Sequence, residues 1–152
     1  RGKVFGQLAR LEVPALALEI KKGIKGVKVI NDSYSSNPTG FLAAMDLLKK
    51  TPAKKKILIT PGIIELGKAS DRIHREIGQK ASRIFNKIFL TKPDFEESIK
   101  KGIAKNKPDD FVKMEEDEVE LLEKLKPFLE KRAAILLEGR LPAYLVKKLC
   151  RS

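Results

Sequence analysis

The sequence has little of the side-chain chemistry that most small enzymes use for catalysis or metal binding. Its 152 residues include one cysteine, one histidine and no tryptophan. The single Cys150 excludes an internal disulfide and a cysteine-rich zinc site, and the single His74 has no partner for a histidine-based metal site. One cysteine is compatible with a reducing cytoplasm, where we expect the protein. We predict no metal site and no nucleophile–base pair within this chain.

Long apolar runs are also missing. No stretch approaches the length of a membrane span, so we expect no membrane partner. The first residues, RGKVFGQLARLEV, lack the apolar stretch of a signal peptide and do not begin with methionine, which predicts a piece cut from a longer chain. The composition, 42% hydrophobic and 34% charged, is ordinary for one globular domain with a substantial core.

Negative charge is in deficit. The formal net charge is +12 and the sequence pI is near 9.8. Such an excess fits nucleic acid, or an anionic small molecule such as a nucleotide, as a partner. The lysines are spread through every segment, however, and aromatic residues make up only 6%, so no stacking platform for bases is evident. A solvated basic surface is the plainer interpretation, and nucleic acid is the less favoured partner.

Short apolar runs alternate with amphipathic patterns along the whole chain. This alternation predicts an α/β, Rossmann-like fold: a mostly parallel sheet with an opening β-hairpin and helices on both faces. No repeat or linker divides the sequence, so we predict a single domain over residues 1–152. The expected strands cover residues 16–20, 27–30, 57–60, 87–90, 111–114 and 133–137. The expected helices cover residues 38–50, 70–84, 94–105, 116–129 and 142–149, with Asn37 and Ser70 as N-caps.

Polar loops follow three of the expected strands. In an open parallel sheet, ligands bind beyond the carboxyl ends of the strands. The densest of these loops reads INDSYSSNP. A carboxylate such as Asp32 can accept hydrogen bonds from ribose hydroxyls, while amide and hydroxyl groups can contact a base or a phosphate. The alternative is a capped loop in which Asp32 and Ser33 bond their own backbone. The three loops are residues 31–39, 61–70 and 139–140.

The stretch GIIELGKAS raises the question of a phosphate-binding P-loop. The pattern G-x-x-x-x-G-K-[ST] fits at Gly62, Gly67 and Lys68 but fails at Ala69, where a hydroxyl would bind Mg²⁺. Ser70 comes one residue late, about 100° around a helix from the required position. The alternative is a turn between strand and helix with glycines at its tight positions.

Three stretches in order resemble the C-terminal domain of the Mur ligases, ATP-dependent amide-forming enzymes of peptidoglycan precursor synthesis. Residues 30–48, INDSYSSNPTGFLAAMDLL, are similar to the family's INDSYNANPxSxxAALxxL. Residues 10–12 match its R-L-E. The ELG of residues 65–67 and the HREIG of residues 74–78 match its GDMLELG…HxEVG, which favours an ELG loop over a P-loop. The resemblance is architectural beyond Gly78, and it is strongest to members that add D-alanyl-D-alanine.

The resemblance implies an ATP-dependent ligase that adds D-alanyl-D-alanine to a UDP-muramoyl peptide through an acyl phosphate. The C-terminal domain would close over the ATP site. It implies ATP and Mg²⁺ as cofactors, with the Mg²⁺ ligands and the P-loop in a central domain that this chain lacks. The partners implied are the central and N-terminal domains of the same ligase, the UDP-muramoyl peptide, and a dipeptide or amino acid. The domain alone is expected to be inactive.

The resemblance also assigns nucleotide contacts to individual residues. Arg10 is expected at the ATP phosphates as the catalytic residue. Asp32 is expected at the ribose and Asn37 near the adenine, with Tyr34 and Ser36 lining the same loop. Each assignment has a structural alternative: a surface arginine, a turn residue or a helix cap.

Four residues are expected to face the amino substrate. They are Glu65 and Gly67 of the ELG loop, His74, and Arg140 after the last strand. His74 lies between core-facing isoleucines, so a buried structural histidine is the alternative.

Two departures from the family pattern put the amino substrate in doubt. Pro61-Gly62 replaces Gly-Asp, and Glu138-Gly139-Arg140 occupies the place of a Lys-Gly-Ser-Arg-like stretch, so that a glutamate replaces a lysine. A related ligase that adds another amino acid or builds another polymer is therefore an open alternative. A stand-alone nucleotide- or nucleic-acid-binding module is the rival from another class.

Overall fold

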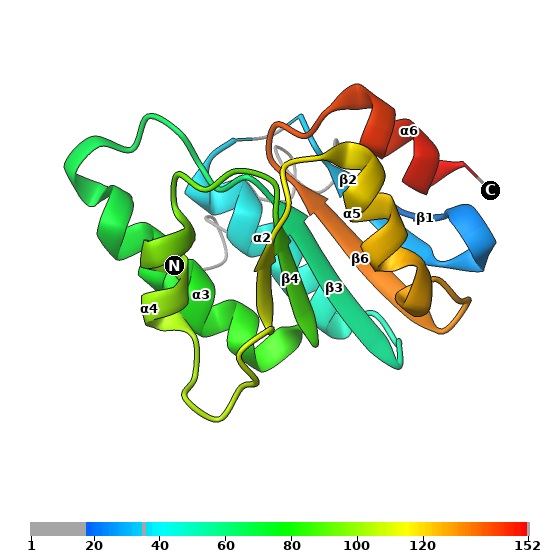
Figure 1. The fold of residues 1–152 in the computed structure, drawn as a ribbon, viewed down its shortest axis with the longest axis horizontal. Helices are drawn as coiled ribbons and strands as arrows, with labels where there is room; N and C mark the ends of the chain where they lie inside the picture. Colours follow the sequence, from blue (N-terminus) through cyan, green and yellow to red (C-terminus); the bar gives the residue numbers. More distant parts are fainter. Residues whose placement is uncertain (1–17, 35, 152) are drawn as a thin grey trace, which may run out of the picture.

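The computed structural model describes residues 18–34 and 36–151, so Arg10 lies outside the described residues. Six strands form one sheet in the order β1-β2-β6-β3-β4-β5 (Figure 1). β1 and β2 are antiparallel, and every other neighbouring pair is parallel. The predicted α/β fold with its opening hairpin is confirmed. The strands are β1 (Ile20–Lys22), β2 (Lys28–Asp32), β3 (Lys55–Thr60), β4 (Lys87–Leu90), β5 (Val112–Met114) and β6 (Ala133–Glu138).

The first strand differs from its prediction. The apolar run predicted a strand over residues 16–20, but β1 begins at Ile20, and Leu18 and Glu19 lie outside it. Strand pairing decides the position, because Ile20 pairs with Ile30 and Lys22 with Lys28. The tip of the hairpin is a short 3-10 turn, η1 (Ile24–Gly26), so the strand extends to the start of that turn.

Helices cover both faces of the sheet, and two apolar cores result (Figure 1). One core lies between the sheet and α2, α3 and α4, and the other between the sheet and α5 and α6. β6 is buried along its whole length, and its side chains alternate between the two cores, as expected for a central strand. The helices are α2 (Pro38–Lys50), α3 (Ser70–Ile84), α4 (Glu96–Gly102), α5 (Glu118–Leu125) and α6 (Ala143–Cys150).

Several helix ends differ from the sequence prediction. α4 is shorter than the expected 94–105, and α5 gives way at its end to a 3-10 turn, η3 (Lys126–Phe128), because Pro127 cannot continue the backbone hydrogen bonds. Ser70 is not an N-cap: it is the first residue of α3, and its side chain makes no cap hydrogen bond. Across residues 18–34 and 36–151, no helix has the length and apolar character needed to cross a membrane.

α3 and α4 approach each other closely through two glycines. A Cβ placed on Gly78 would lie 2.2 Å from the carbonyl oxygen of Ile99, and one on Gly102 would lie 1.9 Å from that of Arg75. Neither distance leaves room for a side chain. The close contact holds α3, and with it the loop that precedes α3, against the rest of the domain.

Candidate functional site

The loops after β2, β3 and β6 meet at the carboxyl edge of the sheet, at the top of Figure 1. The Gly139 N–H donates to the carbonyl oxygen of Asp32 (3.2 Å), which joins the first loop to the last. A Cβ on Gly139, whose φ is +91°, would lie 3.2 Å from Cδ of Pro61 and 3.3 Å from the carbonyl oxygen of Gly62. The structure thus brings together the three loops that were predicted to lie beyond the carboxyl ends of the strands.

Asn31 and Asn37 shape the loop after β2. The Asn31 Oδ1 accepts hydrogen bonds from the backbone N–H (3.1 Å) and the hydroxyl (2.6 Å) of Ser33. The Asn37 Oδ1 accepts from the Gly40 N–H (2.7 Å), which confirms the predicted N-cap of α2. Tyr34 between them is 77% exposed. The side chain that stabilises the local turn is therefore that of Asn31, and the carboxyl group of Asp32 is not needed for this turn.

Asp32 and Glu138 form a buried pair of carboxyl groups at the ends of β2 and β6. The two residues are directly in register, and their side chains are only 2% and 0% exposed. The two carboxyl groups are neighbours, so a hydrogen bond forms between them if one of them carries a proton. Burial, and secondarily Asp32, raises the pKa of Glu138 to about 11. Burial also raises the pKa of Asp32, against the lowering effect of its hydrogen bond with Glu138.

Polar atoms without partners are concentrated at this edge. Four of the five buried side-chain atoms without a hydrogen-bond partner among the described residues are the Oδ2 of Asp32, the Oγ of Ser36 and both carboxyl oxygens of Glu138, and the fifth is the Oε1 of Glu118. Buried polar atoms normally have partners, so unpaired ones mark a place for a ligand, a water or a proton. Hydroxyl groups such as those of a ribose would supply the hydrogen bonds that Asp32 and Ser36 lack.

His74 holds the loop after β3 from inside the protein. Its ring is 0% exposed and stacks on Phe95, with the ring centroids 4.1 Å apart. Its Nε2 accepts from the Ile63 N–H (3.0 Å), so the proton is on Nδ1, which donates to the carbonyl oxygen of Ser70 (2.8 Å). Burial lowers the pKa of His74, although the Ser70 hydrogen bond and Asp71 oppose the shift. This is the structural role named as the alternative, and both ring nitrogens are engaged.

The same contacts exclude the P-loop interpretation. A P-loop offers free backbone N–H groups to phosphates. Here the Gly62 N–H donates to Oγ1 of Thr60 (3.0 Å), and the Ile63 N–H donates to His74. A Cβ on Gly62 would lie 2.5 Å from the Phe95 ring, so this glycine allows close packing inside the domain. The stretch is a turn between β3 and α3.

The other predicted residues of the amino-substrate side are exposed. Glu65, with a φ of +64°, and Gly67, with a φ of +58°, lie at the outer part of the loop after β3. Arg140 follows Gly139 and is also exposed. The structure therefore presents Glu65, Gly67 and Arg140 to solvent, in contrast to His74.

Sequence reasoning missed the carboxyl pair. It noted Glu138 as a departure from the family pattern but did not place it beside Asp32. A usable signal was present, since both residues end apolar strands, and a buried charged residue at such an end needs a partner. No group of three or more histidine, cysteine, aspartate or glutamate side chains is placed to hold a metal in residues 18–34 and 36–151.

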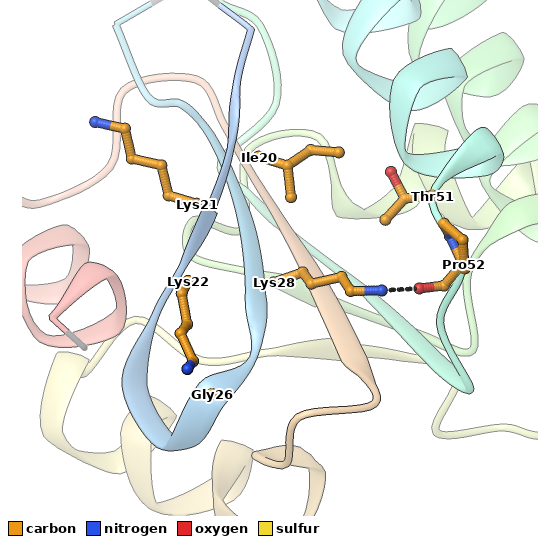
Figure 2. Close-up of a pocket in the computed structure, with 7 residues that line it drawn as sticks. All are labelled: Ile20, Lys21, Lys22, Gly26, Lys28, Thr51 and Pro52. Atoms are coloured by element: carbon orange, nitrogen blue, oxygen red, sulfur yellow. Dashed lines mark hydrogen bonds between the residues drawn. The ribbon is translucent and has the colours of Figure 1, made fainter.

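A basic hollow lies at the opposite, amino-terminal edge of the sheet. Figure 2 shows Lys28 at the start of β2 reaching towards Pro52, whose carbonyl oxygen accepts a hydrogen bond from its ammonium group (2.5 Å). The hollow has a volume of about 470 Å³ and is also lined by Ile20 and Lys22 of β1. It is formed by the hairpin and the end of α2, so it is separate from the loops at the carboxyl edge.

Comparison with known proteins identifies the family of this chain and several of its relatives. The family described as "Mur ligase, glutamate ligase domain" matches residues 18–141. The UDP-N-acetylmuramoyl-tripeptide--D-alanyl-D-alanine ligase of Bacillus subtilis (strain 168) is 33% identical over 84 residues, which are 51% of this chain and 18% of that protein. The ligase of the same name from Buchnera aphidicola subsp. Acyrthosiphon pisum (strain APS) is 40% identical over 62 residues, 40% of this chain and 13% of that protein. The chain thus spans less than a fifth of these relatives.

Solved structures share the fold. MurF ligase from Thermotoga maritima in complex with ADP has a TM-score of 0.67 at 17% identity, over 86% of this chain and 29% of that chain. A domain from a putative UDP-N-acetylmuramate:L-alanyl-gamma-D-glutamyl-medo-diaminopimelate ligase of Haemophilus ducreyi 35000HP has a TM-score of 0.61 at 17% identity, over 87% of this chain and 95% of that chain. The family match, the shared fold and the polar loops at the carboxyl edge lead to one conclusion: this chain belongs to the Mur ligase family, in its glutamate ligase domain.

Proposed function

We propose that this chain is the C-terminal domain of an ATP-dependent ligase that joins D-alanyl-D-alanine to a UDP-muramoyl peptide. The family match and the names of the relatives support this assignment. The observation that carries it is the meeting of the three polar loops around Asp32, at the edge where parallel sheets bind ligands. The alternative within the family is a ligase that adds another amino acid.

The nucleotide side of the site consists of the loop after β2. Asp32 and Ser36 carry buried oxygens without conventional partners, and ribose hydroxyls would satisfy them. Tyr34 is exposed beside them and offers a ring on which a base can stack. Asn37 joins this loop to the first turn of α2. The residues present therefore fit a nucleotide, and Arg10 is proposed to contact its phosphates, where a guanidinium stabilises developing negative charge.

The amino-substrate side consists of the loop after β3 and the residue after Gly139. Glu65 and Gly67 are exposed on the loop, and Arg140 is exposed next to it. The Glu65 carboxylate suits the ammonium group of an incoming amino acid or dipeptide, and the Arg140 guanidinium suits a carboxylate. His74 contributes by holding the loop in place from within the core.

The remaining parts of the reaction belong to other domains of the same protein. We assign the Mg²⁺ ligands and the P-loop to a central domain and the grip on the UDP-sugar to an N-terminal domain. Closure of this domain would exclude water from a reactive acyl phosphate, which water would otherwise hydrolyse. We propose that the reaction takes place in the cytoplasm.

ATP turnover by the full-length ligase tests the proposal. Phosphate release is measured with UDP-muramoyl tripeptide, with and without D-alanyl-D-alanine. We expect dipeptide-dependent release that falls at least about tenfold in Asp32→Ala and Arg10→Ala, because each removes a contact to the nucleotide. The matched controls are Asp109→Ala and Arg83→Ala, which remove exposed side chains away from the three loops. Release restored only by another amine would change the substrate, and no release with any amine would refute the ligase assignment.

A second candidate function rests on the basic hollow of Figure 2. Lys22 and Lys28 line it, and the chain as a whole carries a net charge of +12. A surface of this kind attracts polyanions, so the second candidate function is the binding of a nucleic acid. Lys28 already uses its ammonium group on Pro52, which weakens this candidate.

A further inference from the structure

Asp32 and Glu138 are buried, and no positively charged side chain among the described residues forms an ion pair with either of them. Another interaction must therefore compensate for the burial of the two carboxyl groups. The two side chains face the same side of the sheet as Ile30 and Leu136, because side chains two residues apart along a strand share a face. This side is covered by α2, whose buried side chains are all apolar. Two carboxylates held together in such a place would repel each other strongly, so one of them must be neutral.

Hydrogen bonding leads to the same result. An ionised carboxylate can only accept hydrogen bonds, so two ionised groups cannot bond to each other. Among the described residues, no donor reaches either oxygen of Glu138, and the adjacent Asp32 carboxyl is in register with it on the neighbouring strand. Any hydrogen bond between the two carboxyl groups therefore needs one proton. The buried neighbour on β3, Thr60, uses its Oγ1 to accept from the Gly62 N–H.

We propose that Asp32 and Glu138 share one proton and act as a single unit, in which protonated Glu138 donates to Asp32 and orients it for the nucleotide. Glu138 is thus a positioning residue, and the free Oδ2 of Asp32 is the atom that accepts from a nucleotide hydroxyl. This inference rests on the proposed nucleotide function. Glu138 holds the proton because both of its oxygens are buried without a partner, whereas only the Oδ2 of Asp32 is.

The surroundings favour this distribution of charge. Burial, and then Asp32, keeps the pKa of Glu138 far above that of an ordinary glutamate. Among residues 18–34 and 36–151, no other titratable group contributes to the shift of either carboxyl group: Tyr34 and Arg140 are exposed, and His74 on α3 is neutral.

A carboxyl titration by ¹³C NMR tests the shared proton without any nucleotide. In the 152-residue chain, we expect the Glu138 carboxyl to stay protonated through neutral pH, far above the ordinary glutamate pKa of about 4.3. In Asp32→Asn the Glu138 pKa should be lower than in the native chain, because the neighbouring charge is gone. Ionisation of Glu138 near the ordinary glutamate pKa of about 4.3 would overturn the proposal.

ADP binding to the full-length ligase tests the positioning role. Glu138→Gln keeps a donor for Asp32, so ADP affinity should stay within about twofold of native; Glu138→Leu removes the donor and should weaken binding about tenfold, or about 1.4 kcal/mol. In alkaline buffer the native ligase should lose affinity relative to Glu138→Gln, whose amide does not titrate. A purely structural role would not separate the two pH profiles.

Several outcomes would overturn the inference. Equal affinity of the native, Gln and Leu proteins would show that Glu138 does not orient Asp32. If Glu138→Leu fails to fold, identical pH profiles of native and Glu138→Gln would be decisive against it. Absence of ADP binding by the native ligase would refute the proposed function, and the NMR titration would still decide separately whether the proton is shared.

Discussion

Replacing His74 tests how the loop after β3 is held. In the folded chain the Nε2 of His74 accepts from the buried Ile63 N–H, and the ring stacks on Phe95. His74→Leu keeps most of the apolar volume but leaves the Ile63 N–H without an acceptor, which costs about 1–3 kcal/mol. His74→Gln places an amide oxygen within reach of that N–H. Both variants lose the ring stacking, worth roughly 0.5–1.5 kcal/mol, so their difference isolates the acceptor.

Urea unfolding of the 152-residue chain, followed by circular dichroism, gives the free energy of unfolding of each variant. We expect His74→Gln to be more stable than His74→Leu by about 1–3 kcal/mol. A difference this large is readily measured against the total stability of a small domain, about 5–15 kcal/mol. Equal stability of the two variants would refute the acceptor role of Nε2.

The pH dependence of stability gives a second test of His74. Burial lowers its folded-state pKa, so the unfolded state binds the proton more readily. The contribution of His74 to stability is therefore complete above the ordinary histidine pKa of about 6.5 and is lost as the pH falls through the depressed folded value. The difference in stability between the native chain and His74→Gln should grow from pH 5 to pH 7, roughly the range of histidine titration. A difference independent of pH would show that His74 is not buried in its neutral form.

Two further predictions concern packing and charge. Gly78→Ala should lower the free energy of unfolding by about 1–3 kcal/mol, because its Cβ would meet the carbonyl oxygen of Ile99 and force α3 and α4 apart; thermal unfolding measures this, and native-like stability would contradict the close approach. The native chain should bind immobilised DNA weakly, and the double variant Lys22→Ala, Lys28→Ala should reduce this retention at low salt. Tight retention at low salt that falls steeply as the salt concentration rises would favour the nucleic-acid module over the ligase.

Much of the fold was predictable because the buried strands read as short apolar runs. The run of β6 and that of β3 predicted strands within two residues of the observed ends. The errors have different causes: β1 is positioned by its pairing with β2, which is a tertiary contact, whereas α5 ends at Leu125 because the nearby Pro127 cannot continue the helix, which is a local rule that the prediction overlooked. Ser70 looked like a cap, but in the folded chain its carbonyl oxygen accepts a hydrogen bond from His74 and its hydroxyl contacts the same ring.

The candidate site was predictable in outline. Loops that follow parallel strands lie at one edge, so the sequence alone placed Asp32 and Glu65 there. It could not decide between a P-loop and a plain turn, because that choice depends on whether the N–H groups of Gly62 and Ile63 are free. Thr60 and His74 occupy them, and these contacts exist only in the folded chain.

By itself, the amino-acid sequence determined the alternation of strands and helices, the family, and the identity of the polar groups at the strand ends. These properties depend on local patterns and on residue order. Only the tertiary structure placed Glu138 beside Asp32, because the order β2-β6-β3 makes neighbours of strands that are distant along the chain. Burial then determined their charge, because two neighbouring carboxyl groups that are removed from water cannot both be ionised without a large energetic cost.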